Sequence, residues 1–329
     1  MRLRNLVSSL LFAAIVSGPA SADVLIVGNK GEDTVSFISL KSGKLCARVS
    51  TGKAPHEIAI SPDGRQAAVV AYGGTSIDLF NIREQRLVRR IDLAPNAGPH
   101  GIAWISAGRI AVTFDRSNSV ALIDPRDLSF TSVATGQRGS HMLAVSPDGR
   151  RAHVANILSG SVTVIDLDRM VKLRDIATGG NPEAIAITRD GKDLWVGDHS
   201  GPRVRVIDLA TGKLAATLPT DPFAIRLAMT PDGKTAVASN FQSGTLSLFD
   251  VRSRRPLRTI KLSGSAKAMQ VTIAISNNSR LAYVAETGSD QIAEVDLRAG
   301  KVLRRIPTGR GGDGLAVIKG NCSVPDREP

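Results

Sequence analysis

The fold is decided by the segment VSPDGRRAHVANILSGSVTVID, residues 145–166. It holds a Ser-Pro-Asp-Gly turn, an apolar run ending at Asn156, a second polar turn and a run from Val162 to Asp166. In the second run, successive residues point to opposite faces, and both faces carry β-branched or apolar side chains, as in strands packed between two sheets. Polar turns bound both runs at strand length. The segment therefore predicts two short strands of an all-β unit.

This segment recurs along the chain with a nearly constant period. The apolar run ending at Asn156 has counterparts that end at Asn29, Tyr72, Phe114, Asp198, Asn240 and Glu286. Successive ends are 43, 42, 42, 42, 42 and 46 residues apart. The Val-Ile-Asp run and the Ser-Pro-Asp-Gly turn keep the same step. Three patterns that share one period over seven copies indicate a repeat architecture.

Four short runs fit into each repeat of about 42 residues, which is typical of one propeller blade. The chain after residue 22 starts on a second-strand segment, Val24 to Gly28, and finishes on a first-strand segment, Leu315 to Ile318. We therefore expect an all-β, seven-bladed β-propeller over residues 23–320, with four antiparallel strands per blade. The C-terminal strand should pair with the N-terminal blade and close the ring, which leaves no long exposed edge.

Residues 1–22 have the pattern of an export signal. Arg2 and Arg4 precede an apolar stretch from Leu6 to Val16, and Ala20-Ser21-Ala22 supplies a cleavage pattern of small residues. The apolar stretch is too short to span a bilayer, and no later segment is apolar enough. The sequence predicts a periplasmic protein without a transmembrane segment, made of the propeller and a tail, residues 321–329.

The composition favours an anionic partner. The net charge is +12, or about +10 without the two arginines of the leader. Only 4% of the residues are aromatic, so few rings are available for base stacking, and nucleic acid is disfavoured. We expect a protein partner, acidic or redox-active, and a monomeric propeller. Basic residues gather in the loops after the first and third strands, which should share the bottom face; they include Lys44, Arg65, Arg83, Arg109, Arg150, Arg151, Lys192, Lys213, Arg252, Arg254, Arg255, Arg280 and Lys301. This face is either a solvated rim or an electrostatic docking surface.

The two cysteines are expected to form a disulfide. Cys46 enters the outermost strand of the first repeat, and Cys322 follows the closing inner strand of the same blade by four residues. The blade is about 14 Å wide at roughly 4.8 Å per strand, and four extended residues span about 13 Å. An oxidising compartment and an even cysteine count favour the bond. The alternative is two unpaired thiols.

Three of the five histidines occupy one position of the repeat. His56, His100 and His141 each lie nine residues before the basic residue that closes the turn. Glu183 and Asp313 take the same position in other repeats, and Ile225 and Val271 in the remaining two.

Three imidazoles with a carboxylate are a sensible ligand set for zinc or copper. The candidate ligand-binding residues are His56, His100, His141, Glu183, His199 and Asp313, and the first three are the candidate metal ligands. His199 joins because its loop falls on the same face. The alternative is that each histidine only caps its turn through a hydrogen bond to the backbone.

No catalytic residue is predicted. Ser140-His141 and Asp198-His199-Ser200 are adjacent in sequence, which does not establish triad geometry. The aspartates that recur at the end of the third strand, among them Asp166, are interpreted as turn-forming residues. Whether the chain is an enzyme stays open, with a non-catalytic protein favoured.

The repeats resemble those of the YVTN-type seven-bladed β-propellers, relatives of the WD-repeat propellers that lack the Trp-Asp signature. The resemblance covers Val24 to Ile318 and rests on the Val-Ala-Asn and Val-Ile-Asp strands and on the Thr-Gly-Lys and Ser-Pro-Asp-Gly turns. It implies the fold and little about activity. Members of the family range from surface-layer and scaffold proteins to accessory factors of periplasmic redox systems, and related propellers include copper-site enzymes and lactonases.

The expectation is an exported binding or scaffold protein, accessory to a periplasmic redox or envelope system. The rival hypothesis is a copper- or zinc-dependent enzyme with its site at the top of the central channel.

Overall fold

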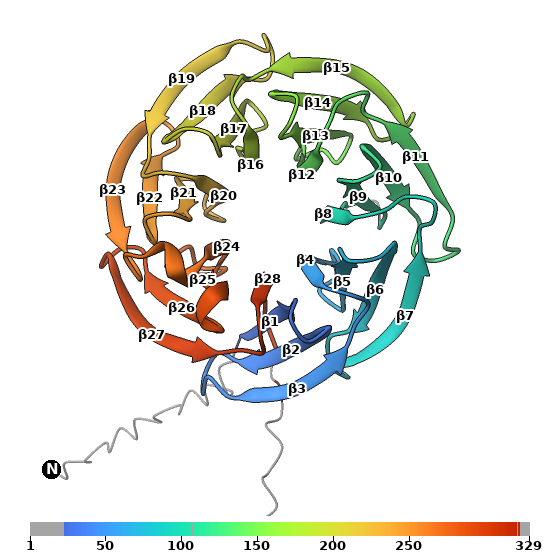
Figure 1. Cartoon of the computed structure of the whole chain (residues 1–329), viewed down its shortest axis with the longest axis vertical. Coiled ribbons are helices and arrows are strands. Elements are labelled where there is room, and N and C mark those ends of the chain that lie inside the picture. Colours follow the sequence, from blue (N-terminus) through green and yellow to red (C-terminus); the bar gives the residue numbers. More distant parts are fainter. Residues whose placement is uncertain (1–22, 107, 321, 323–329) are drawn as a thin grey trace, which may run out of the picture.

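Seven four-stranded antiparallel sheets are arranged in a ring around a central axis, called the channel below, in the computed structural model, which describes residues 23–106, 108–320 and 322 (Figure 1). The predicted leader, residues 1–22, and the tail beyond Cys322 lie outside the described residues. Blades are numbered here along the chain, and each is given from its inner to its outer strand. Blade 1 is β28 (Gly312–Ile318), β1 (Val24–Asn29), β2 (Thr34–Ser39) and β3 (Leu45–Ser50); blade 2 is β4 (Pro55–Ile60), β5 (Gln66–Ala71), β6 (Ser76–Asn81) and β7 (Arg86–Asp92).

The other five blades follow the chain without a crossover. Blade 3 is β8 (Pro99–Trp104), β9 (Ile110–Phe114), β10 (Ser119–Ile123) and β11 (Phe130–Ala134); blade 4 is β12 (Ser140–Val145), β13 (Arg151–Asn156), β14 (Ser161–Asp166) and β15 (Val171–Ala177); blade 5 is β16 (Pro182–Ile187), β17 (Asp193–Asp198), β18 (Arg203–Asp208) and β19 (Leu214–Pro219); blade 6 is β20 (Ala224–Met229), β21 (Thr235–Asn240), β22 (Thr245–Asp250) and β23 (Arg255–Lys261); blade 7 is β24 (Gln270–Ile275), β25 (Leu281–Glu286), β26 (Gln291–Asp296) and β27 (Lys301–Pro307). The predicted fold is confirmed.

Burial within a blade explains the residue pattern of each strand. The second and third strands are covered on both faces by neighbouring blades; β13 and β14 are almost entirely buried. The outer strand β15 is exposed except at buried Ile176 and half-buried Lys172. Apolar clusters therefore lie between adjacent blades, as where Trp195 of blade 5 packs against Phe249 of blade 6 with ring centres 5.9 Å apart.

Polar residues in the repeat pattern have local structural roles. Asn156 is fully buried and its amide donates to the hydroxyls of Ser161 and Thr163 on the next strand, at 3.1 and 2.9 Å. Asp166 accepts hydrogen bonds from the backbone of residues 168 and 169 and so forms the turn after the third strand. The interpretation of these aspartates as turn formers agrees with the structure.

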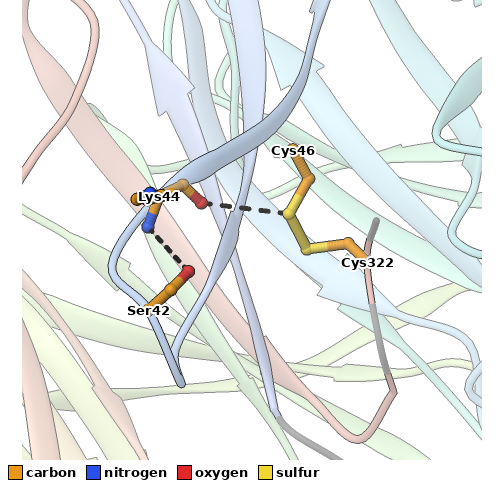
Figure 2. The surroundings of a disulfide bond; sticks show 4 residues. All are labelled: Ser42, Lys44, Cys46 and Cys322. Atoms are coloured by element: carbon orange, nitrogen blue, oxygen red, sulfur yellow. Dashed lines mark hydrogen bonds between the residues drawn. A yellow bond between two sulfur atoms is a disulfide. The ribbon is translucent and has the colours of Figure 1, made fainter. Parts of the chain in front are cut away.

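The two ends of the chain close the ring in blade 1. β28 pairs antiparallel with β1, with Leu25 opposite Val317. Cys46 of β3 and Cys322 are joined by a disulfide across a Cα separation of 5.8 Å, with the Lys44 carbonyl oxygen 3.8 Å from Sγ of Cys46 (Figure 2). The predicted closure and disulfide are both confirmed.

Strand direction defines two faces of the ring. Inner and third strands run from the face called the top to the face called the bottom, and the second and outer strands return. The turn at residues 61–65 is therefore on the bottom, and the loop at residues 93–98 is on the top. The described helices are two three-residue 3-10 turns, Ala266–Ala268 and Thr287–Ser289, and none of the described helices is long and apolar enough to cross a membrane.

Candidate functional site at the channel mouth

The histidine position of the repeat is the second residue of every inner strand. It holds His56 in β4, His100 in β8, His141 in β12, Glu183 in β16 and Asp313 in β28. All five side chains therefore lie at the top mouth of the channel. The rings of His56 and His100 have centroids 4.2 Å apart, and those of His100 and His141 are 3.5 Å apart. Counting from the turn thus predicted this gathering from sequence.

A backbone irregularity adds a second set of residues. In all seven blades the pairing of the inner strand with its neighbour shifts by one residue close to this position, as between Pro55 and Ile58 in β4. A bulge of this kind re-aims a side chain that would otherwise point to the opposite face. Glu57 and Arg226, the third residues of β4 and β20, consequently join the cluster.

Arg226 joins opposite parts of the ring. Its Nε and Nη2 donate to Oε1 of Glu57 in blade 2 at 3.1 and 2.9 Å. Nη1 donates to Oε1 of Glu183 in blade 5 at 3.3 Å and to its neighbouring carbonyl at residue 225 at 2.9 Å. Arg226 is only 5% exposed. Because β4 and β20 are not neighbouring inner strands, the guanidinium links two different sides of the channel by hydrogen bonds.

Asp313 is held by a separate group of partners. Lys30, from the turn after β1, donates to Oδ2 at 3.0 Å, and the Thr272 hydroxyl donates to Oδ1 at 3.0 Å. Nε2 of His56 lies 3.5 Å from Oδ2. Blades 1, 2 and 7 therefore meet at this one carboxylate, which is 2% exposed.

The third residue of an inner strand can carry a side chain only where the adjacent inner strand does not approach its Cα too closely. Gly314 occupies this position in β28, and a Cβ there would overlap the backbone carbonyl of His56. Gly101 occupies it in β8, where a Cβ would lie 2.9 Å from the His141 carbonyl oxygen. Inner strands thus approach one another closely enough around the mouth to exclude larger residues at these two places.

Burial determines the protonation of the three stacked histidines. It is the largest influence in each case and lowers the pKa of His56 to about 3 and that of His141 to about 4. The pKa of His100 also lies well below its usual value, because of burial and its two histidine neighbours. All three rings are therefore neutral at neutral pH.

The three carboxyl groups respond differently to burial. Burial raises the pKa of Glu57 despite the attraction of Arg226. For Glu183 burial is outweighed by the hydrogen bond with His199 and the charge of Arg226, so its pKa is lowered. Burial also opposes ionisation of Asp313, but the positive charge of His56 when protonated and of Lys30 and Arg226 lowers its pKa to about 2. Of the three carboxyl groups, Glu57 therefore holds a proton most readily.

His199 connects this buried cluster to the surface. Nδ1 lies 3.3 Å from Oε2 of Glu183, and this hydrogen bond raises the pKa of His199. The ring stacks on Phe223 with centroids 3.9 Å apart and planes 2° from parallel. Tyr72, on the other side of the mouth, meets the edge of the His100 ring at 5.3 Å and donates to Asp115 at 3.1 Å.

The predicted ligand residues therefore lie together at the channel mouth. No group of three or more His, Cys, Asp and Glu side chains among the described residues is arranged to hold a metal ion. The Nδ1 atoms of His56, His100 and His141 are buried and have no hydrogen-bond partner among the described residues. They do not cap their turns through Nδ1, and the metal hypothesis stays a prediction.

Fold and site together define a seven-bladed β-propeller with a charge-paired channel mouth. The sequence profile of the family described as "Lactonase, 7-bladed beta-propeller" matches residues 20–222, and the chain belongs to this family. Antigen Lp49 of Leptospira interrogans is 20% identical over 286 residues, which are 80% of this chain and 59% of that protein. The chain thus spans little more than half the length of this curated relative.

Solved structures share the fold at low identity. Hydrazine synthase of Kuenenia stuttgartiensis aligns with a TM-score of 0.70 and 20% identity, over 82% of this chain and 96% of that one. The dihydro-heme d1 dehydrogenase NirN, solved in complex with DHE, aligns with a TM-score of 0.67 and 17% identity, over 93% and 77%. A functionally unknown protein from Desulfotomaculum acetoxidans aligns with a TM-score of 0.77 and 14% identity, over 91% and 99%.

Proposed function

We propose that this chain is an exported binding propeller of the YVTN type, accessory to a periplasmic redox system, that docks an acidic protein partner on its bottom face. The leader-like pattern of residues 1–22 and the disulfide support export to an oxidising compartment. The names of two structural neighbours, a hydrazine synthase and a dihydro-heme d1 dehydrogenase, support the redox association.

The observation that carries the proposal is the contrast between the buried, paired charges of the channel mouth and the exposed arginines of the bottom face. At the channel mouth Arg226, Glu57 and Glu183 are buried and paired with one another. On the bottom face Arg252 and Arg255 have no ion-pair partner within the described residues. Charges that are already paired and buried hold the ring together, whereas exposed unpaired charges are available to attract a partner.

The test is partner capture from a periplasmic extract at several salt concentrations, with Arg252→Glu/Arg255→Glu as the variant. Arg254 is left intact because it makes a bidentate pair with Asp193 at 2.9 Å, so its replacement would also disturb the fold. Docking by this face predicts weaker capture by the variant and a shallower dependence on salt. Unchanged affinity and salt dependence in the variant would refute docking, and a secreted form that retains residues 1–22 would refute cleavage of the leader.

A second candidate is a copper- or zinc-dependent enzyme acting at the channel mouth. The three neutral imidazoles with buried, unpartnered Nδ1 atoms favour it, since neutral imidazole is the form that ligates these metals. The measurement is metal content of protein purified without a His-tag, beside a His100→Phe variant. Less than about a tenth of an equivalent of copper or zinc in the unaltered protein would exclude this candidate.

A further inference from the structure

Two neighbouring cavities on the bottom face lie across blades 4, 5 and 6, and together they are called the groove. The first, of about 570 Å³, lies between blades 4 and 5, and the second, of about 490 Å³, lies between blades 5 and 6. Asp190, in the turn after β16, lines both. Each cavity is within the size range of sites that bind small ligands or peptide side chains.

The charged residues of the first cavity differ in how many partners they already have within the protein. Oδ1 of Asp148 accepts hydrogen bonds from the Ser146 hydroxyl at 2.5 Å and from the backbone of Arg150 at 3.0 Å, so this oxygen is used within its own turn. Arg151 and Arg174 are exposed and have no ion-pair partner among the described residues. Arg174 makes one hydrogen bond, to the Leu209 carbonyl at 2.9 Å. Both arginines therefore keep donors that are free to bind a partner.

The same cavity has apolar walls and one unused buried polar atom. Val164, Leu173 and Leu209 line it, and Leu173 is 45% exposed on the outer strand. His153 also lines it, is 3% exposed, and its Nδ1 has no hydrogen-bond partner among the described residues. A simple anion would use only the arginines. A peptide would also cover the apolar wall.

The turn of blade 5 lies between the two cavities and contributes residues to both. Arg189 stands where blades 2, 4 and 6 have proline, and its guanidinium donates to the Pro231 carbonyl at 3.2 Å. Arg254 is paired with Asp193, whereas Arg252 has no ion-pair partner among the described residues. In this second cavity four basic residues, Arg189, Lys192, Arg252 and Arg254, lie beside three acidic ones, Asp190, Asp193 and Asp232, whereas the first cavity has two of each.

We propose that this groove is a peptide-binding site that takes an extended acidic segment of a partner protein, with its carboxylates on Arg151 and Arg174 and an aliphatic side chain against Leu173. The inference rests on the proposed function and narrows it, because it assigns docking to one groove of the bottom face and names the chemistry of the bound segment.

The test is binding of a fluorescent synthetic peptide in which glutamate and leucine alternate, measured by anisotropy. The groove variant is Arg151→Glu/Arg174→Glu. Its matched control is Arg65→Glu/Arg83→Glu, which makes the same change of charge in the bottom turns of blade 2, outside the two cavities. We expect the groove variant to bind at least about tenfold more weakly and the control to change by less than about threefold. Replacing the leucines of the peptide by serine should also weaken binding to the unaltered protein.

The outcomes separate this inference from the proposed function. Equal weakening in both variants would refute the groove and leave general docking by the bottom face intact. Peptide binding that is indifferent to loss of the leucines would mean that the groove holds simple anions, which overturns the peptide assignment. Absence of peptide binding by the unaltered protein would also overturn it, while capture of a salt-sensitive partner from a periplasmic extract would still support the proposed function.

Discussion

The channel mouth and the bottom groove are built from the same residue types and use them in opposite ways. At the mouth Arg226 is 5% exposed and is shared by Glu57 and Glu183. In the groove Arg151 and Arg174 are exposed, and the nearby Asp148 is engaged by its own turn. Removing one member of a buried pair leaves an uncompensated charge, whereas an exposed arginine is screened by water. The position in the blade, rather than the residue type, therefore separates structural charges from available ones.

Among the substitutions that test this comparison, Arg226→Met is expected to have the largest effect on stability. The substitution leaves Glu57 and Glu183 buried without their cation and should lower the free energy of unfolding by about 3–5 kcal/mol. Denaturation in urea measures it, with Arg252→Met as the exposed control, expected to change stability by less than about 0.5 kcal/mol. Adding Glu57→Gln and Glu183→Gln should restore part of the loss. Equal effects of the two arginine substitutions would contradict the comparison.

Loss of the disulfide should have the next largest effect. The bond fastens the tail after β28 to the outer strand of blade 1 across 276 residues of sequence. The double variant Cys46→Ser/Cys322→Ser should lose about 2–4 kcal/mol of unfolding free energy, because the unfolded chain regains the freedom that the bond removed. Unfolding of the oxidised protein and of the variant in urea gives the difference. A variant as stable as the parent would mean that strand pairing between β1 and β28 suffices to close the ring.

Acid should destabilise the channel mouth as its buried histidines become protonated. The pKa values of His56 and His141 are lowered from 6.5 to about 3 and about 4, so the unfolded state binds more protons than the folded state over this interval. Stability should therefore fall as pH decreases from 6.5 towards 4, by up to about 1.4 kcal/mol per pH unit for each buried histidine. The raised pKa of Glu57 acts in the opposite direction, because folding then favours its protonated form.

The pH dependence is checked by urea unfolding across this range for the parent and for His141→Asn. The variant should show a smaller slope of stability against pH, since one titrating group has been removed. An identical slope would mean that His141 is accessible to protons in the folded state. Asp313, with its pKa lowered to about 2, should contribute a further loss only as pH falls below about 3.9.

The smallest effect on stability is expected on the bottom face. Arg252→Glu/Arg255→Glu should shift the unfolding free energy by less than about 0.5 kcal/mol. A loss above about 2 kcal/mol would show that these arginines are structural after all, and it would remove the contrast between the two faces.

Much of the fold could be predicted because its information is local and repeated. The Ser-Pro-Asp-Gly turn at residues 146–149 and the alternating run Val162 to Asp166 define strands by turn chemistry and by a period of two. Seven copies with one period then define the ring. The Cys46–Cys322 bond followed from the same topology, because both ends of the chain had to complete one blade.

The candidate site was predicted only in part. His56, His100, His141, Glu183 and Asp313 could be found by counting from the turn, since equal positions in a repeat lie at equal heights in the ring. Glu57 and Arg226 could not, because a regular strand would direct them away from the second position. The one-residue bulge in each inner strand brings them back, and the turn sequence carries no signal of it.

What the sequence determined by itself is therefore the all-β blade, the number of blades, the closure through blade 1 and the height of each residue along the channel. These follow from hydrophobic alternation, turn chemistry and period, which act over a few residues at a time. Only the tertiary structure decided that Arg226 reaches Glu57 across 169 residues of sequence and that Arg151 and Arg174 line the same groove. Contacts of this kind depend on the bulge and on the angle between blades, and these are set by packing of the whole ring.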